Sequence, residues 1–104
     1  MGCMKYKVSI SSSAEADLKN LALFLLQMMS IEGAYKYLHA MQLEIMSLSV
    51  LADLYHPSNF MDVRAYNPKT CHMVSHNKKW VYIFHIENDS VIIDRIRPAK
   101  LIAK

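Results

Sequence analysis

The residues of this chain that could carry out chemistry are concentrated in its last third, from Lys78 to Lys100. There, aromatic and aliphatic side chains alternate around one histidine, and cations gather toward the end, in the order K-K-W-V-Y-I-F-H-I-E-N-D-S-V-I-I-D-R-I-R-P-A-K. Aromatic rings beside guanidinium groups favour stacking, and together they suit an anionic partner that carries bases, such as RNA. The alternative is that these charges only keep an apolar sheet in solution.

A group able to transfer protons is present in the same stretch. RNA cleavage requires an activated 2′-hydroxyl, stabilisation of the charge on the phosphate, and protonation of the leaving oxygen. His85 is the best-placed group to exchange protons, and Asp94, expected diagonally across from it on one face, could orient its imidazole. The competing interpretation is that His85 is a partly buried strand residue at a domain or partner surface.

This stretch is predicted to be a β-hairpin, because two alternating runs flank the two-residue turn Asn88-Asp89. The expected opposing pairs are Ile86 with Val91, Phe84 with Ile93, Tyr82 with Arg95, and Trp80 with Arg97. One face would then change from aliphatic at the turn to two rings and two arginines at the open end. Tyr82 and Arg95 are accordingly expected to bind RNA or its phosphates, together with Lys79, which adjoins the same site.

Upstream, the pattern predicts a strand followed by two helices. Tyr6, Val8 and Ile10 alternate with polar residues, which indicates a half-buried strand, and Ser11-Ser12-Ser13 then offers N-caps. Two apolar stripes at helical spacing follow: Leu18, Leu21, Ala22, Leu25 and Met29, then Ala34, Leu38, Met41, Ile45 and Leu48. Gly33 interrupts the pattern between them, so the two helices are expected to form an antiparallel hairpin.

Three further apolar residues, Leu23, Phe24 and Leu26, widen the stripe of the first helix beyond one core contact. That helix is therefore either sandwiched within the fold, or its second side meets a partner.

Later segments are predicted from turn residues and short alternating runs. Asp53 to Asn59 is expected to be a loop, Met61 to Tyr66 a strand, and Asn67-Pro68-Lys69 a turn. Cys71 to Val74 either forms another strand or leads directly into the strand that begins at Trp80.

Length and composition predict one packed domain over residues 1–104. The chain is 53% hydrophobic and has only two glycines, which argues against disorder. The net charge of +3 is uneven: residues 1–61 hold four Lys/Arg against five Asp/Glu, and residues 62–104 hold eight against four. The basic half is therefore the half that contains the predicted hairpin.

Neither a metal, a cofactor nor a membrane is expected. Cys3 and Cys71 are far apart, and His72 and His76 would share a face only in a helix, where the sequence indicates loop or strand. No apolar run reaches the roughly 18 residues of a membrane-spanning helix, and no signal-peptide pattern is visible. The chain is therefore expected to be cytoplasmic, with reduced thiols.

In this order of elements, β-α-α-β-β-β, the chain resembles the RelE/ParE superfamily of bacterial toxins from type II toxin–antitoxin systems. The similar segments are K-Y-K-V-S-I-S, S-A-E-A-D-L-K-N-L, A-Y-K-Y-L with I-M-S-L, V-R-A-Y, and the hairpin with its tail R-I-R-P-A-K. The resemblance implies an α+β fold in which a small, twisted, mainly antiparallel sheet packs on the two-helix hairpin.

The resemblance also implies a function. Members are neutralised by a cognate antitoxin that wraps the toxin, and the complex is expected to bind operator DNA through the antitoxin. Some members cleave mRNA on the ribosome without a metal ion, and others poison DNA gyrase. For this chain a translation-inhibiting endoribonuclease of a plasmid-stabilisation module is expected first. The alternatives are a gyrase poison and a catalytically silent relative that only binds its antitoxin. The antitoxin should cover Leu23, Phe24 and Leu26, and a sheet face bearing Val81, Ile83, Ile92 and Ile96.

Catalytic residues are implied by the matching motif positions. Arg64 in V-R-A-Y matches a basic position on a strand, and Arg97 and Lys100 in R-I-R-P-A-K match the basic tail that follows the last strand. With His85 they form the expected catalytic set. Two departures count against cleavage: Val81 stands where ribonucleases similar to RelE carry an arginine, and no tyrosine follows Arg97.

Overall fold

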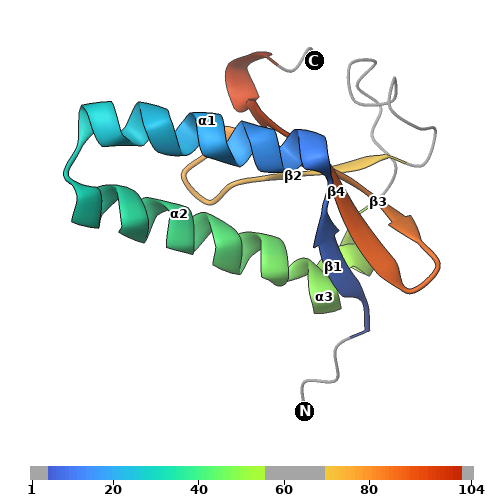
Figure 1. Ribbon diagram of the computed structural model, residues 1–104. Helices are drawn as coiled ribbons and strands as arrows, with labels where there is room; N and C mark the ends of the chain where they lie inside the picture. Colours follow the sequence, from blue (N-terminus) through green and yellow to red (C-terminus); the bar gives the residue numbers. More distant parts are fainter. Residues whose placement is uncertain (1–4, 56–69, 102–104) are drawn as a thin grey trace.

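A four-stranded mixed sheet carries a hairpin of two long helices on one face (Figure 1). The computed structural model describes residues 5–55 and 70–101. In chain order the elements are β1 (Lys7–Ile10), α1 (Ser12–Met28), α2 (Ile31–Met46), α3 (Leu48–Leu51), the 3-10 turn η1 (Ala52–Leu54), β2 (Cys71–Val74), β3 (Trp80–Glu87), β4 (Ser90–Pro98) and the 3-10 turn η2 (Ala99–Leu101). The expected α+β class is confirmed, whereas the expected strand from Met61 to Tyr66 and the expected turn Asn67-Pro68-Lys69 lie outside the described residues. The loop expected from Asp53 to Asn59 is described only as far as Tyr55, and its start is wrong, because Asp53 and Leu54 belong to η1.

The strands lie in the order β1-β4-β3-β2. β1 runs parallel to β4, whereas β3 is antiparallel to both β4 and β2. The sheet is therefore mainly antiparallel, as expected. Cys71 to Val74 forms a separate edge strand, which pairs with β3, rather than a lead into it.

A serine side chain begins each long helix. Ser11 Oγ accepts a hydrogen bond from the Ala14 N–H at 3.1 Å, and Ser30 Oγ accepts one from the Gly33 N–H at 3.0 Å. These bonds satisfy amide groups that the first helical turn leaves without partners. Only two residues separate the end of α1 from the start of α2, so the chain reverses tightly there and the expected helical hairpin is confirmed. Gly33, which was expected to lie between the helices, is instead in the first turn of α2.

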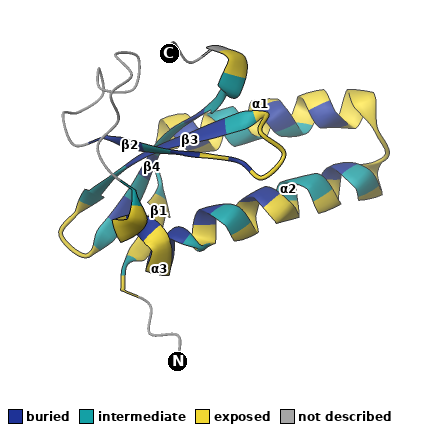
Figure 2. Ribbon diagram, turned by 180° about the vertical axis from the view of Figure 1, so that it is seen from behind, coloured by how far each residue is buried: buried dark blue, intermediate teal, exposed yellow. Residues whose placement is uncertain are grey.

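The main core lies between the helices and one face of the sheet. Its largest wholly buried side chains are Tyr82, Phe84, Ile45, Leu48, Ile93 and Val91. Buried residues recur as stripes along α1 and α2, and the outer faces of both helices are exposed (Figure 2). The helical periodicity of the sequence therefore identified the faces that pack on the sheet.

The pairing of β3 with β4 differs from the expected register. Ile86 lies opposite Val91 and Phe84 opposite Ile93, as predicted, but the register then shifts between Ile83 and Phe84. Beyond the shift the pairs are Ile83 with Arg95, Tyr82 with Ile96, Val81 with Arg97, and Trp80 with Pro98. The expected pairs of Tyr82 with Arg95 and of Trp80 with Arg97 are wrong, because a β-bulge leaves Asp94 as an extra residue in β4.

The bulge decides which side chains of β4 meet the helices, because it puts Ile96 rather than Arg95 opposite Tyr82 in the main core. Val81 and Ile83, which alternate with Tyr82 and Phe84 on β3, form a second buried cluster against Ala99. Successive residues of a strand point to opposite faces, so this second cluster lies on the other side of the sheet. Ile96 is consequently not on the sheet face where the antitoxin was expected.

Candidate functional site

Tyr82 is a core residue rather than part of an RNA-binding face. Its side chain is 0% exposed, and its hydroxyl donates a 2.6 Å hydrogen bond to Glu44 Oε1 on α2. Burial, followed by the hydrogen bond and charge of Glu44, raises the pKa of Tyr82 well above its usual value. In this position the ring cannot meet a base, and the phenol remains protonated.

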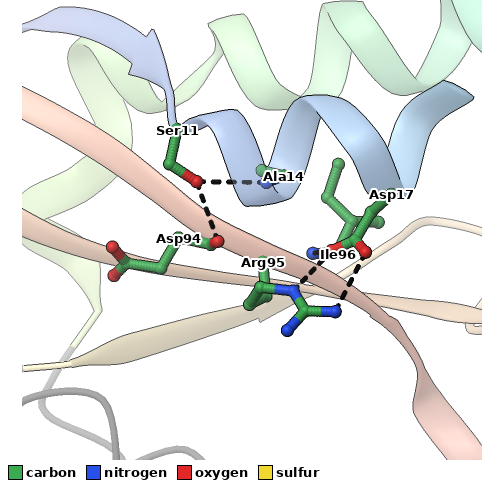
Figure 3. Close-up of polar contacts among 6 residues, drawn as sticks. All are labelled: Ser11, Ala14, Asp17, Asp94, Arg95 and Ile96. Carbon is green, nitrogen blue, oxygen red and sulfur yellow. Dashed lines mark hydrogen bonds and ion pairs between the residues drawn. The ribbon is translucent and has the colours of Figure 1, made fainter.

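Arg95 is held by a carboxylate of the chain itself. Its Nε donates to Asp17 Oδ2 at 2.8 Å and its Nη2 donates to Asp17 Oδ1 at 3.0 Å, while the Ile96 N–H donates to the same carboxylate at 2.9 Å. Burial alone would raise the pKa of Asp17, but the hydrogen bonds from Arg95 and Ile96, with the charges of Arg95 and Arg97, lower it. The bidentate pair (Figure 3) occupies the Nε–Nη2 edge of the guanidinium, one of the two edges that could bind a phosphate.

The first turns of α1 hold the bulged part of β4 (Figure 3). Ser11 Oγ, which caps α1, also donates a 2.9 Å hydrogen bond to the Asp94 carbonyl oxygen. Asp17, six residues further along the chain, binds Arg95 and the Ile96 amide. The extra residue Asp94 and the two residues that follow it are therefore held by α1 and its N-cap.

His85 and Asp94 form the pair that the sequence predicted. His85 Nδ1 lies 2.7 Å from Asp94 Oδ2, and the two side chains are only 17% and 20% exposed. His85 lies opposite Ile92, on the side of the sheet away from the main core. A carboxylate at Nδ1 orients the imidazole and leaves Nε2 to accept or donate a proton.

The basic residues of the expected site gather elsewhere. Lys79 and Lys100 line a cavity of about 440 Å³, and Arg97 lines an adjoining cavity of about 220 Å³. Together the two cavities form what we call the basic groove. Its lining residues are Asp17, Asn20, Leu21, Phe24, Lys78, Lys79, Trp80, Ile96, Arg97, Pro98, Ala99 and Lys100.

The basic groove does not include His85. Arg97 lies opposite Val81, and Val81 is four residues from His85 on β3, which is about 13 Å at the rise of a strand. The structure thus brings Lys79, Arg97 and Lys100 together but leaves the His85–Asp94 pair apart from them. Arg64 lies outside the described residues.

The sequence did not single out Tyr37, whose hydroxyl binds Trp80 and Asn77 at one end of the groove. Its hydroxyl accepts a hydrogen bond from Trp80 Nε1 at 2.9 Å and another from Asn77 Nδ2 at 3.0 Å. Nothing in the sequence pairs Tyr37 with residues some forty positions away. Phe24 was noted in the sequence because it widens the apolar stripe of the first helix, and the structure adds that it borders both cavities.

The part of the chain that the structure describes has neither a candidate metal site nor a membrane-spanning helix. Within residues 5–55 and 70–101, no group of three His, Cys, Asp or Glu side chains could hold a metal ion. None of the helices described is long and apolar enough to cross a membrane.

Comparison with known proteins supports the fold and little else. No model of a known protein family matches the sequence, and no curated protein matches it. Among solved structures, the chain is similar to one titled "Chromosomal ParDE TA system from P. aeruginosa", with a TM-score of 0.74 and 15% sequence identity. The match covers 92% of this chain and 98% of that chain. The two chains therefore share a fold, and the fold expected from the resemblance to the RelE/ParE superfamily is confirmed.

Proposed function

We propose that this chain is the toxin of a type II toxin–antitoxin module and that it acts on DNA gyrase, as ParE-like toxins do. The observation that carries the proposal is the fold shared with a chain of a ParDE system over nearly the full length of both chains. The cognate partner would be a short antitoxin, whose complex with this chain would bind operator DNA, and the site of action would be the cytoplasm.

The arrangement of the polar residues favours a binding toxin over a ribonuclease. Cleavage of RNA needs a base, an acid and phosphate-binding cations around one phosphate. Here the His85–Asp94 pair is separated from Arg97 and Lys100, and Val81, at the position of the ribonuclease arginine, is only 3% exposed. A toxin that acts by binding a protein target does not need a base, an acid and cations gathered around one phosphate.

A ribosome-dependent endoribonuclease is the second candidate, because of one specific observation. The 2.7 Å contact between His85 and Asp94 orients an imidazole that is still 17% exposed, and a general base requires such an oriented, accessible ring. Arg64, outside the described residues, would then have to supply a phosphate contact beside that pair.

The exposed apolar side chains of α1 support the antitoxin as partner. Leu23, Phe24 and Leu26 are 64%, 53% and 48% exposed, although each would gain from burial. Antitoxin segments that fold on binding can cover such a surface. We expect co-expression with the neighbouring reading frame to raise the yield of folded protein.

Toxicity in growing bacteria tests the proposal. Induced expression of the chain should arrest growth, accumulate double-strand DNA breaks and induce the SOS response. Co-expression of the adjacent reading frame should prevent all three effects. The control is Phe84→Asp, which places a charge in the core and should be inactive because it does not fold.

A supercoiling assay with purified gyrase completes the test. The chain should inhibit supercoiling and trap cleaved plasmid, and the Phe84→Asp protein should do neither. Intact gyrase activity together with mRNA cut in the ribosomal A site would replace the proposal by the second candidate. A chain that binds the neighbouring protein but harms neither process would be a silent relative.

A further inference from the structure

The floor of the basic groove is apolar and aromatic. Phe24 on α1, Trp80 at the start of β3 and Pro98 at the end of β4 line both of its cavities. Leu21 and Ile96 continue this apolar lining on one side, and Ala99 continues it on the other. The groove therefore offers a place for bulky apolar side chains, next to the exposed ring of Phe24.

Four cations surround this floor. Lys78, Lys79 and Lys100 line the larger cavity and Arg97 lines the smaller one, and none of them forms an ion pair with another described residue. The only acid that lines the groove, among the residues described, is Asp17, whose carboxylate is already bound by Arg95 and the Ile96 amide. The groove thus has an excess of positive charge that no residue described here balances.

The turn that carries two of these lysines is rigidly held. The Lys78 N–H donates to the Ser75 carbonyl oxygen at 2.9 Å, and the Lys79 N–H donates to Asn77 Oδ1 at 3.0 Å. Asn77 is bound in turn to Tyr37 on α2. Lys78 has a φ of 64°, an unfavourable conformation for a lysine, which such a network of contacts must maintain.

Trp80 is fixed by the same network. Its Nε1–H donates to the hydroxyl of Tyr37, and its backbone N–H donates to Ser75 Oγ at 3.1 Å. The Trp80 ring and the backbone that carries Lys78 and Lys79 are consequently in place before any ligand arrives. Pre-organised groups of this kind lose little conformational entropy on binding.

We propose that the basic groove binds an acidic, amphipathic peptide segment of the protein partner. Its apolar side chains would pack on Phe24 and Trp80, and its Asp or Glu residues would meet Lys78, Lys79 and Lys100. The apolar floor favours a peptide over a nucleic acid, whose phosphates need cations along the path of the backbone rather than only at the rim. The inference rests on the proposed function in that it assigns a place to the antitoxin, and it adds the chemistry of the segment that binds.

The groove contains its own reporter, because Trp80 is the only tryptophan of the chain. Random peptides of about twelve residues, long enough for an ~18 Å helix, can be displayed on phage and selected against the folded full chain. Enriched peptides should contain Asp or Glu on both sides of two bulky apolar residues. The same peptides, made synthetically, should change the Trp80 fluorescence in a saturable way and bind less tightly as salt is raised.

Charge reversal at the rim locates the binding. Lys78→Glu with Lys100→Glu should weaken the selected peptides by about tenfold or more, since two favourable charge pairs become repulsive. Phe24→Ala should weaken them as well, through loss of the apolar contact. The matched controls are Lys7→Glu on β1, at the far edge of the sheet, and Leu43→Ala on α2, an exposed leucine that does not line the groove.

Three results would overturn the inference. One is a neutral or basic consensus among the enriched peptides, or no enrichment. Another is equal binding of the selected peptides to the double lysine variant. The third is a single-stranded RNA of similar length that changes the Trp80 fluorescence and competes out the peptides, which would assign the groove to nucleic acid.

The inference and the proposed function can fail separately. Toxic chains that carry Phe24→Ala or the double lysine change should escape neutralisation by the neighbouring protein if the groove binds it. If that protein still neutralises both variants fully, the groove is not its site, although the toxin proposal would stand. If the wild-type chain harms no cell but still binds acidic peptides, the proposed function fails, whereas the inference that the groove binds acidic peptides stands.

Discussion

The hydroxyl of Tyr82 on β3 donates a 2.6 Å hydrogen bond to Glu44 Oε1 on α2. The second oxygen of the same carboxylate accepts a 2.6 Å hydrogen bond from the His76 N–H. One glutamate therefore joins the central strand, the turn between β2 and β3, and the second helix. It links the core to the turn that carries Lys78 and Lys79 to the basic groove.

Removing the Tyr82 hydroxyl should destabilise the fold. Tyr82→Phe keeps the buried ring but leaves Glu44 Oε1 without its donor, and a hydrogen bond to a charged acceptor contributes about 2 kcal/mol. Urea denaturation at pH 7 should show a loss of this size. Tyr35→Phe is the control, because Tyr35 is 70% exposed and should change the free energy of unfolding by less than about 0.5 kcal/mol. Equal stability of Tyr82→Phe and the wild type would mean that water replaces the bond at no cost.

Tyr82 should also make the protein sensitive to alkali. Burial and the bond to Glu44 raise its pKa above the usual 10.0, so near pH 10 the unfolded chain loses the phenolic proton and the folded chain keeps it. This part of the stability is complete below pH 10 and falls by about 1.4 kcal/mol per pH unit above it. In Tyr82→Phe this fall of the free energy of unfolding with pH should be absent. Urea titrations from about one pH unit below the usual tyrosine pKa of 10.0 to about one unit above it can detect the difference.

The clamp between Asp17 and Arg95 should contribute to stability and to acid sensitivity. Asp17→Asn removes the charge that holds Arg95 and should cost about 2 kcal/mol at pH 7. The pKa of Asp17 is lowered in the folded chain, so its contribution is present above its usual value of 3.8 and is lost as the pH falls through the folded-state pKa. In the variant, stability should fall less steeply in acid.

The surface pair of Lys36 with Glu32 is a control for this clamp. Its two side chains are 75% and 79% exposed, and Lys36→Ala should change the free energy of unfolding by less than about 0.5 kcal/mol. A similar small effect of Asp17→Asn would show that the bulge does not depend on the ion pair.

The two serine N-caps should differ in their contributions. Ser30 Oγ makes one bond to its own helix, whereas Ser11 Oγ caps α1 and also donates to Asp94 O on β4. Ser30→Ala should cost about 1 kcal/mol, and Ser11→Ala about 1 kcal/mol more. Thermal or urea unfolding of the two variants measures the difference. Equal losses would indicate that the Ser11 bond to β4 is energetically neutral.

The His85–Asp94 pair should be dispensable for toxicity if the chain acts on gyrase. His85→Ala and Asp94→Asn should then arrest growth as the wild type does at equal expression, because no proton is transferred. A ribonuclease would lose most of its activity, since general acid–base catalysis contributes roughly a hundredfold or more. Non-toxic variants with unchanged unfolding midpoints would favour RNA cleavage.

Local sequence patterns determined most of the fold. The serine run Ser11-Ser12-Ser13, the two helical stripes and the turn at Asn88-Asp89 are short-range signals, and each of them predicted an element that the structure contains. The second capping serine, Ser30, was not predicted. Asp94 beside His85 was also predictable, because the register is correct near the turn. The hairpin turn fixes the pairing only for the residues closest to it.

Tertiary structure decided the bulge and, through it, the candidate site. Ser11 and Asp17, 83 and 78 residues away in the chain from Asp94 and Arg95, hold the extra residue of β4 in place. No local pattern specifies contacts over such separations, since they arise only when α1 packs on β4. The resulting shift placed Ile96, rather than Arg95, opposite Tyr82 and in the core, whereas the packing of α1 beside the strand ends gathered Phe24, Trp80 and the cations around one groove.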